Sequence, residues 1–144
     1  MIAPRCFFDT SVLAPVYLSI HVHHGPSLAL YSELSSGAGY LSLHSLAELY
    51  NTLTKPATPG RMSPVHALDC LNDVKMRLSL VNLDGAEYLQ AALGLASLNL
   101  GGPLIYDALL LQAARRVNAE TIYTWNVRHF QRLAPDLASR IRTP

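Results

Sequence analysis

Short apolar runs alternate with stretches of helical periodicity along the whole chain. The runs predict strands at residues 5–8, 40–43, 78–83 and 121–124, with a last edge strand near Ile141. Helices are expected from Thr10, over 28–34, from Ser45, from Ser63, from Asp84 and over 104–117. Strands and helices in alternation predict an α/β domain with a mostly parallel sheet, which we expect to span residues 1–144 as a single domain.

Several of the expected helix starts carry capping signals. Ser63 precedes a proline at the first helical position, and Asp84 with Glu87 matches a capping box. Ser45 with Glu48 matches the same box, ahead of an apolar stripe made of Leu46, Leu49, Tyr50 and Leu53. The helix over 104–117 is apolar all the way round, which predicts that it is buried. Residues 55–60 contain two prolines and a glycine and are expected to form a loop.

The composition excludes a disordered chain and indicates a surface with few charges. Half of the 144 residues are hydrophobic and 15% are charged, against a usual charged share of about 25%. Such a surface favours self-association or a partner. The net charge of +1 gives no nucleic-acid signal by itself, but six arginines lie from residue 115 onward.

Other sequence features bear on where the protein works. No apolar run reaches the roughly 20 residues of a membrane helix, and the N-terminus lacks the apolar core of a secretory signal. The two cysteines, Cys6 and Cys70, lie far apart and fit a reducing cytoplasm. We therefore expect a cytoplasmic protein that does not bind a membrane.

Three acids are the strongest candidates for chemistry. Asp9 directly follows the first strand, and Glu48 lies in the first turn after the second strand. Functional groups gather at the carboxyl ends of parallel strands, so both acids are placed at the functional edge of the sheet. Asp107 lies in the apolar helix, where a buried carboxylate needs an arginine, a helix N-terminus or a metal as its partner.

Each acid also has a purely structural interpretation. Asp9 could cap the helix from Thr10, Glu48 could complete the capping box of Ser45, and Asp107 could interact with a helix N-terminus. In that case the three carboxyl groups would not face one pocket. The sequence contains no glycine-rich phosphate loop, no close Ser/His/Asp set and no zinc spacing. The run from His21 to His24 is expected to be a solvated loop.

Four motifs together resemble a known family. They are Phe8-Asp9-Thr10-Ser11-Val12-Leu13, Ser45-Leu46-Ala47-Glu48-Leu49, Tyr106-Asp107-Ala108-Leu109 and Thr124-Trp125-Asn126-Val127-Arg128-His129-Phe130. In this order, and spanning nearly the whole chain, they resemble the PIN-domain nucleases, and among these the VapC-type toxins of bacterial toxin–antitoxin pairs. The resemblance implies a three-layer PIN-like fold with four or five mostly parallel strands flanked by helices. It also implies a metal-dependent endoribonuclease that hydrolyses phosphodiester bonds in RNA.

The resemblance assigns roles to individual residues. Asp9, Glu48 and Asp107 match three family acids that bind Mg²⁺ or Mn²⁺, and Asp9 is expected to be the central ligand. Asn126 matches the place where many members carry a fourth acid, and we include it as a catalytic candidate because its amide can hydrogen-bond to a metal-bound water. The expected substrate-binding residues are Thr10, Ser11, Thr124, Arg128 and His129.

The resemblance also implies partners. These are an RNA substrate, a small antitoxin that covers the cleft, and a second copy of the chain in a homodimer. Asn126 motivates an alternative, in which the fold binds RNA or protein with weak or no nuclease activity because one negative charge is missing.

Overall fold

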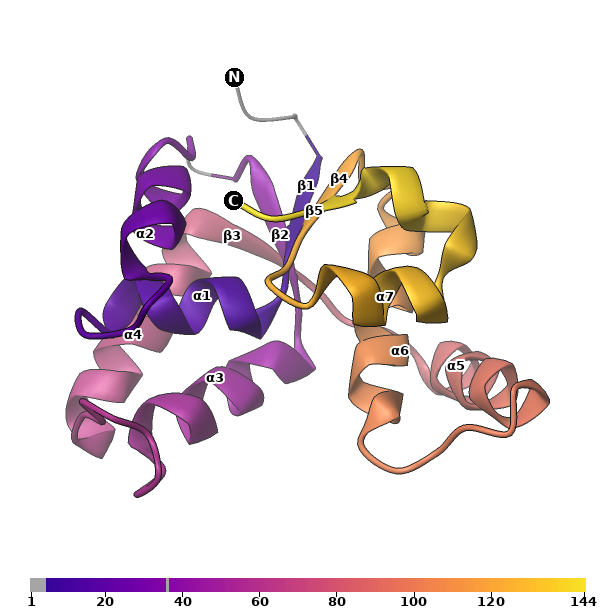
Figure 1. The fold of residues 1–144 in the computed structure, drawn as a ribbon, viewed down its shortest axis with the longest axis horizontal. Coiled ribbons are helices and arrows are strands. Elements are labelled where there is room, and N and C mark those ends of the chain that lie inside the picture. Colours follow the sequence, from indigo (N-terminus) through magenta and orange to yellow (C-terminus); the bar gives the residue numbers. More distant parts are fainter. Residues whose placement is uncertain (1–4, 36) are drawn as a thin grey trace.

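A five-stranded, all-parallel sheet forms the centre of the computed structural model, which describes residues 5–35 and 37–144 (Figure 1). Its strand order is β3-β2-β1-β4-β5. The strands are β1 (Cys6–Phe8), β2 (Gly39–Ser42), β3 (Leu78–Val81), β4 (Thr121–Tyr123) and β5 (Ile141–Arg142). The predicted strands, including the last edge strand, are therefore confirmed, with ends that shift by one or two residues.

Seven α-helices and one 3₁₀ helix connect the strands within the described residues. They are α1 (Thr10–Tyr17), α2 (His24–Ser32), α3 (His44–Thr54), α4 (Pro64–Arg77), α5 (Gly85–Ser97), α6 (Leu104–Arg116), α7 (Val127–Leu133) and the 3₁₀ helix Pro135–Arg140. None of the described helices is both long enough and apolar enough to cross a bilayer.

The side chains of the central strand β1 divide the core into two layers. Cys6 and Phe8 pack against α1 to α4, whereas Phe7 packs with α5 to α7 on the other face of the sheet. Figure 1 shows the two groups of helices on opposite sides of the strands. This alternation follows from the two-residue period of a strand, and it produces the predicted α/β fold of three layers.

Two helix starts confirm the capping signals. The Ser63 hydroxyl accepts a hydrogen bond from the backbone N–H of His66, and Asp84 and Glu87 exchange both bonds of a capping box. Helix α6 is buried at its centre, as predicted, but its first turn is open, and Tyr106 is 49% exposed. The all-round apolar pattern therefore overstated the burial of this turn, which borders a pocket.

The capping box predicted for Ser45 is wrong. Helix α3 begins at His44, and its N-cap is Leu43, two residues before the predicted cap, so Ser45 lies inside the first turn. There the Ser45 hydroxyl is buried and has no hydrogen-bond partner within the described part of the chain. Glu48 instead pairs with His44, one helical turn before it.

The histidine run is not simply a solvated loop, which corrects a second expectation. Helix α2 begins at His24 rather than at Leu28. The His24 ring bonds through Nδ1 to the backbone oxygen of Pro15 at 2.7 Å, and this contact fixes the first turn of α2 against α1. Ser27 and Tyr31, one turn apart, are the buried residues of the helix, whereas Leu28 is exposed.

Candidate active site

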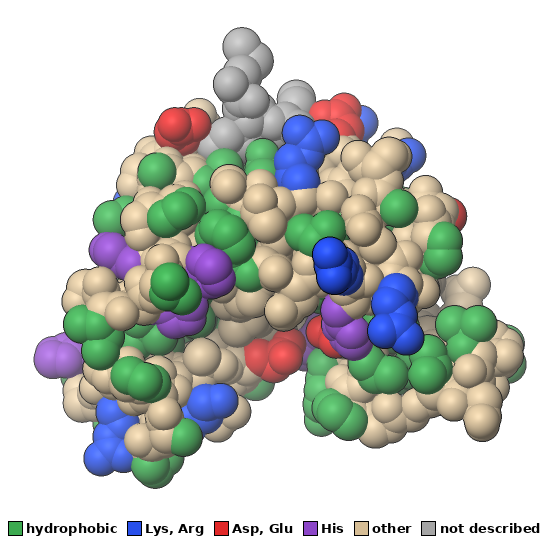
Figure 2. Space-filling view, viewed as in Figure 1, with side chains coloured by type: hydrophobic (Ala, Val, Ile, Leu, Met, Phe, Trp, Pro, Cys, Tyr) green, Lys and Arg blue, Asp and Glu red, His purple; other side chains and the backbone are tan. Residues whose placement is uncertain are grey.

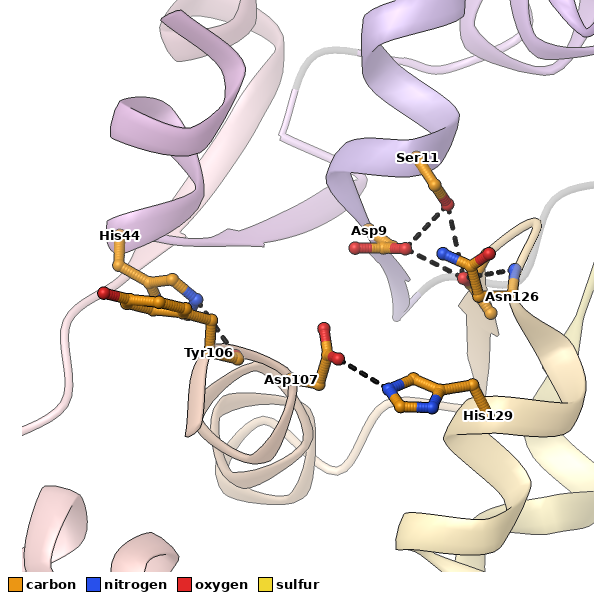
Figure 3. A network of polar contacts seen from close by, with 8 residues as sticks. Asp9, Ser11, His44, Tyr106, Asp107, Asn126 and His129 are labelled. Atoms are coloured by element: carbon orange, nitrogen blue, oxygen red, sulfur yellow. Dashed lines mark hydrogen bonds and ion pairs between the residues drawn. The ribbon is translucent and has the colours of Figure 1, made fainter. Parts of the chain in front are cut away.

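Asp9 occupies the carboxyl end of the central strand. Its backbone N–H donates to the carbonyl of Tyr123 on β4, which fixes its position between the two strands. Its side chain does not cap α1. Instead, its Oδ2 atom accepts hydrogen bonds from the hydroxyls of Ser11 (2.6 Å) and Thr124 (2.8 Å) (Figure 3). The described residues provide no hydrogen bond to the second carboxylate oxygen, Oδ1, which is therefore free to bind a ligand.

The protein environment makes ionisation of Asp9 costly. Burial raises the pKa of the Asp9 carboxyl, and the hydrogen bonds from Ser11 and Thr124 oppose this rise. The negative charges of Asp107 and Glu48 raise the pKa further. A cation placed among these carboxylates would relieve both their desolvation and their mutual repulsion.

Asp107 enters the site from the first turn of α6. Its Oδ2 atom lies 2.7 Å from Nε2 of His129 on α7 (Figure 3). Burial raises the pKa of Asp107, the contact with His129 lowers it, and the charge of Glu48 raises it. The partner of this carboxylate is therefore a histidine, a possibility that the sequence reasoning did not include.

Glu48 enters the site from α3, where it is paired with His44. The Glu48 Oε1 atom lies 3.2 Å from His44 Nε2, which also lies 3.1 Å from the backbone oxygen of Tyr106. The other ring nitrogen of His44 is 2.7 Å from the Ser42 hydroxyl at the end of β2. His44 thus connects β2, α3 and the first turn of α6, and only its spacing of four residues from Glu48 could have indicated this role.

The three acids line one pocket of about 420 Å³, together with Thr10, Ser11 and Asn126. A pocket shared by all three acids is not what the purely structural interpretation predicts. Among residues 5–35 and 37–144, no three His, Cys, Asp or Glu side chains stand close enough together to hold a metal ion as they are placed. Glu48 and Asp107 are each paired with a histidine, His44 and His129 respectively.

The other predicted site residues lie at different depths. Thr124 is fully buried behind Asp9, and its hydroxyl also accepts the backbone N–H of Asn126. The structure thus places Thr124 where it orients Asp9. Thr10 lines the pocket, and its buried hydroxyl has no hydrogen-bond partner in the described ranges. Asn126 lies between this pocket and a second one that it shares with Arg128 and His129.

The six arginines from residue 115 onward divide into three with side-chain partners and three without. Arg140 has partners, since it donates to Asn118 and to the backbone oxygen of Ala119. Arg115 and Arg116 form ion pairs with Asp136 and Glu87, respectively. Three others are exposed and have no hydrogen bond or ion pair from their side chains within the described residues; they are Arg128, Arg132 and Arg142. Figure 2 shows exposed acidic side chains at the centre of one face, with histidine and Lys or Arg side chains beside them. A negatively charged ligand could therefore meet cations next to the pocket.

Two residues that border the pocket were not predicted from the sequence. His21 and His23 belong to the histidine run, and both line the pocket together with the acids and Trp125. The run itself was the only signal for the two histidines, because the turn that brings them to the carboxyl edge depends on how α2 packs against α1.

Comparisons with known proteins agree with this architecture. The family model of the PIN domain matches residues 6–134. Ribonuclease VapC27 of Mycobacterium tuberculosis is 30% identical over 117 residues, which cover 81% of this chain and 82% of the relative. Ribonuclease VapC40 of the same species is 32% identical over 122 residues, covering 85% and 84%, respectively. The chain belongs to the PIN-domain family, and within it to the VapC-type proteins.

Two solved structures share the fold at lower sequence identity. One is Mycobacterium tuberculosis VapC20, described as a toxin that cleaves the sarcin-ricin loop, with a TM-score of 0.69, 19% identity, and coverage of 84% of this chain and 89% of that chain. The other is VapBC2 from Rickettsia felis bound to a DNA fragment of its promoter, with a TM-score of 0.64, 18% identity, and coverage of 96% and 98%. These likenesses confirm the predicted PIN-like fold.

Proposed function

We propose that this PIN-domain protein is a Mg²⁺- or Mn²⁺-dependent endoribonuclease, the toxin of a toxin–antitoxin pair. The observation that carries this proposal is the meeting of Asp9, Glu48 and Asp107, from three separate elements, around one pocket. The two relatives named above carry the name ribonuclease, which supports RNA as the substrate.

The donor atoms of the pocket suit a hard divalent cation. Mg²⁺ and Mn²⁺ prefer oxygen ligands, and the three acids offer only carboxylate oxygens. Asp9 would bind through its free Oδ1, while Glu48 and Asp107 would exchange their histidine contacts for the cation. When bound, such an ion activates a water molecule and offsets the charge that develops on the phosphate.

The chain's own residues have the remaining roles. Ser11 and Thr124 hold the Asp9 carboxylate in one orientation through Oδ2. His129 and His44 pair with Asp107 and Glu48, and these are the contacts that the cation would replace. Arg128, which lines the neighbouring pocket, would bind a backbone phosphate of the RNA.

Cleavage of single-stranded RNA by the purified protein tests this proposal. Cleavage is expected with Mg²⁺ or Mn²⁺ and is expected to stop when EDTA is added. Cleavage that continues unchanged in EDTA would contradict the metal-dependent mechanism, and the absence of any cleavage with either ion would favour the binding-module alternative.

Asn126 motivates the binding-module alternative, because it leaves the pocket without a fourth acid. Replacing it with aspartate tests whether this missing charge weakens metal binding. Asn126→Asp would place a fourth negative charge at the pocket. We expect it to tighten Mn²⁺ binding by about tenfold, because one more close carboxylate adds roughly 1–2 kcal/mol of attraction at a partly exposed site. Isothermal titration calorimetry measures this affinity, with Asn72→Asp on α4 as the control for added charge.

The effect of Asn126→Asp on the Mn²⁺ dependence of RNA cleavage is a second test. If the wild-type protein cuts RNA, Asn126→Asp is expected to lower the Mn²⁺ concentration needed for half-maximal rate. Equal Mn²⁺ affinity in the wild type, Asn126→Asp and Asn72→Asp would show that residue 126 does not face the cation.

The antitoxin and a homodimer are proposed as protein partners. The exposed surface carries large apolar side chains that are more than half exposed, on α4 and α5; they are Val65, Leu68, Leu89 and Leu93. Covering these side chains would remove apolar surface from water, which stabilises a complex. Residues 1–144 would form a single PIN domain in that complex, and a protein that cuts cellular RNA would act in the cytoplasm.

A further inference from the structure

Three aromatic side chains form one border of the pocket that contains the acids. The rings of His23 and Trp125 are stacked, with centroids 3.8 Å apart and planes only 7° from parallel. The His21 ring continues this arrangement, 5.6 Å from that of His23 and tilted by 38°. We call His21, His23 and Trp125 the aromatic wall; all three line the same pocket as Asp9, Glu48 and Asp107.

Hydrogen bonds connect this wall directly to Asp9. The backbone N–H of Trp125 donates to the Ser11 hydroxyl at 3.0 Å, and the same hydroxyl donates to the Asp9 carboxylate. The indole Nε1–H of Trp125 donates to the hydroxyl of Ser27, which is fully buried in α2. Trp125 is therefore held through its backbone at Ser11 and through its indole nitrogen at Ser27, and the Ser11 hydroxyl connects it to Asp9.

The histidine side of the wall is also held in place. The backbone N–H of His23 donates to Nδ1 of His21, and His24 anchors the start of α2 to Pro15. Further along α2, the Tyr31 hydroxyl lies 3.1 Å from that of Tyr17 on α1, and Tyr17 donates its proton to Asp73 on α4, whose Oδ2 also lies 3.3 Å from the Tyr31 hydroxyl. These contacts stabilise α2 against its neighbours, so the wall is an ordered surface.

We propose that the aromatic wall binds an unpaired base of the RNA beside the phosphate that is cut. This inference rests on the proposed function, since it deepens the substrate recognition of the same site. Single-stranded RNA is recognised largely by stacking of its bases on aromatic side chains, histidine included. Every base has a flat aromatic face, so a wall of this kind accepts any base and positions the strand without reading its sequence.

Two features favour stacking over a charge contact with phosphate. Burial and the neighbouring His23 and His24 lower the pKa of His21, which favours the neutral form of its ring. A separate cation, the exposed Arg128, lines the neighbouring pocket. The phosphates and the bases of one strand would thus meet different sides of the site.

Trp125 is the only tryptophan of the chain, so its fluorescence reports on the wall directly. The test is a titration in EDTA, without cleavage, of a short single-stranded oligoribonucleotide and of an abasic chain of equal length. The oligoribonucleotide is expected to change the fluorescence of Trp125, and the abasic chain is not. Equal changes with both chains, or none with RNA, would overturn the proposal.

Variants of His23 separate stacking from folding. His23→Ala is expected to weaken RNA binding by about tenfold, measured by anisotropy of a labelled strand, and to leave binding of the abasic chain unchanged. His23→Phe keeps a flat ring and is expected to restore the affinity. His66→Ala, an exposed histidine on α4, is the matched control. Equal affinity of His23→Ala and the wild type, or equal losses in His23→Ala and His23→Phe, would overturn the proposal.

The same proteins distinguish this inference from the proposed function. Base-dependent binding without metal-dependent cleavage would contradict the proposed nuclease activity but support base binding by the aromatic wall. Cleavage that is unaffected by His23→Ala, together with base-independent binding, would support the nuclease activity but contradict base binding by the aromatic wall.

Discussion

Asp9→Asn is expected to lower RNA cleavage by more than about 100-fold and, at the same time, to stabilise the folded protein at neutral pH. Substitutions beside a metal ligand usually cost 10- to 100-fold in activity, so loss of the central ligand should cost more. The gain in stability follows from the position of the carboxylate, which is buried and lies near two other acids. An amide of the same shape can still accept the hydrogen bonds from Ser11 and Thr124 but carries no charge.

The stabilisation should depend on pH in one direction. The pKa of Asp9 is raised in the folded state above its ordinary value of 3.8, so the folded state binds this proton more tightly than the unfolded state. The wild-type protein therefore loses stability as pH rises from 3.8 through the raised pKa. The difference in Tm between Asp9→Asn and the wild type should be absent below pH 3.8 and largest at neutral pH.

Thermal unfolding at several pH values, alongside a cleavage assay, measures both effects. Asp69→Asn on α4 is the control, because it removes an exposed carboxylate away from the pocket. It should leave cleavage unchanged. An Asp9→Asn protein that cuts RNA as well as Asp69→Asn does would remove Asp9 from the mechanism.

Thr124→Val is expected to lower kcat/KM by about 10- to 100-fold, although the side chain cannot reach the substrate. The hydroxyl of Thr124 holds Oδ2 of Asp9 and accepts the N–H of Asn126, and valine removes both contacts while keeping the shape. Because this hydrogen bond lowers the pKa of Asp9, its loss should raise that pKa. The acidic limb of the pH profile of kcat/KM should therefore move to higher pH.

Matched variants show whether the effect belongs to the hydroxyl. Thr121→Val changes another buried threonine, on β4, that makes no contact with Asp9, and it should retain both the rate and the pH profile. Thr124→Ser keeps a hydroxyl and should restore most of the activity. A Thr124→Val protein with an unshifted pH profile would show that Thr124 supports only the fold.

The sequence predicts the fold and the three acids because both depend on local patterns. Apolar runs that alternate with helical periodicity define the parallel sheet, and its carboxyl edge then locates Asp9 and Glu48. Asp107 follows from the cost of a carboxylate in an apolar helix. Each of these inferences needs only neighbouring residues and one topological rule.

The contacts of the acids depend on residues far apart in the chain and could not be predicted in the same way. Thr124 reaches Asp9 across 115 positions, and His129 reaches Asp107 from another helix. The capping box predicted at Ser45 is wrong because the N-cap of α3 is Leu43, two residues earlier, which puts Ser45 inside the helix. The stacking of His23 on Trp125 likewise requires α2 to be docked against α1 first.

The most direct test of the central claim is the position of Mn²⁺ in a crystal of the wild-type protein, read from its anomalous scattering. The account predicts an anomalous peak in the pocket bounded by Asp9, Glu48 and Asp107, with carboxylate oxygens as the protein ligands. A peak that lies away from these three acids, or a pocket without Mn²⁺ in crystals of a protein that cuts RNA, would contradict it.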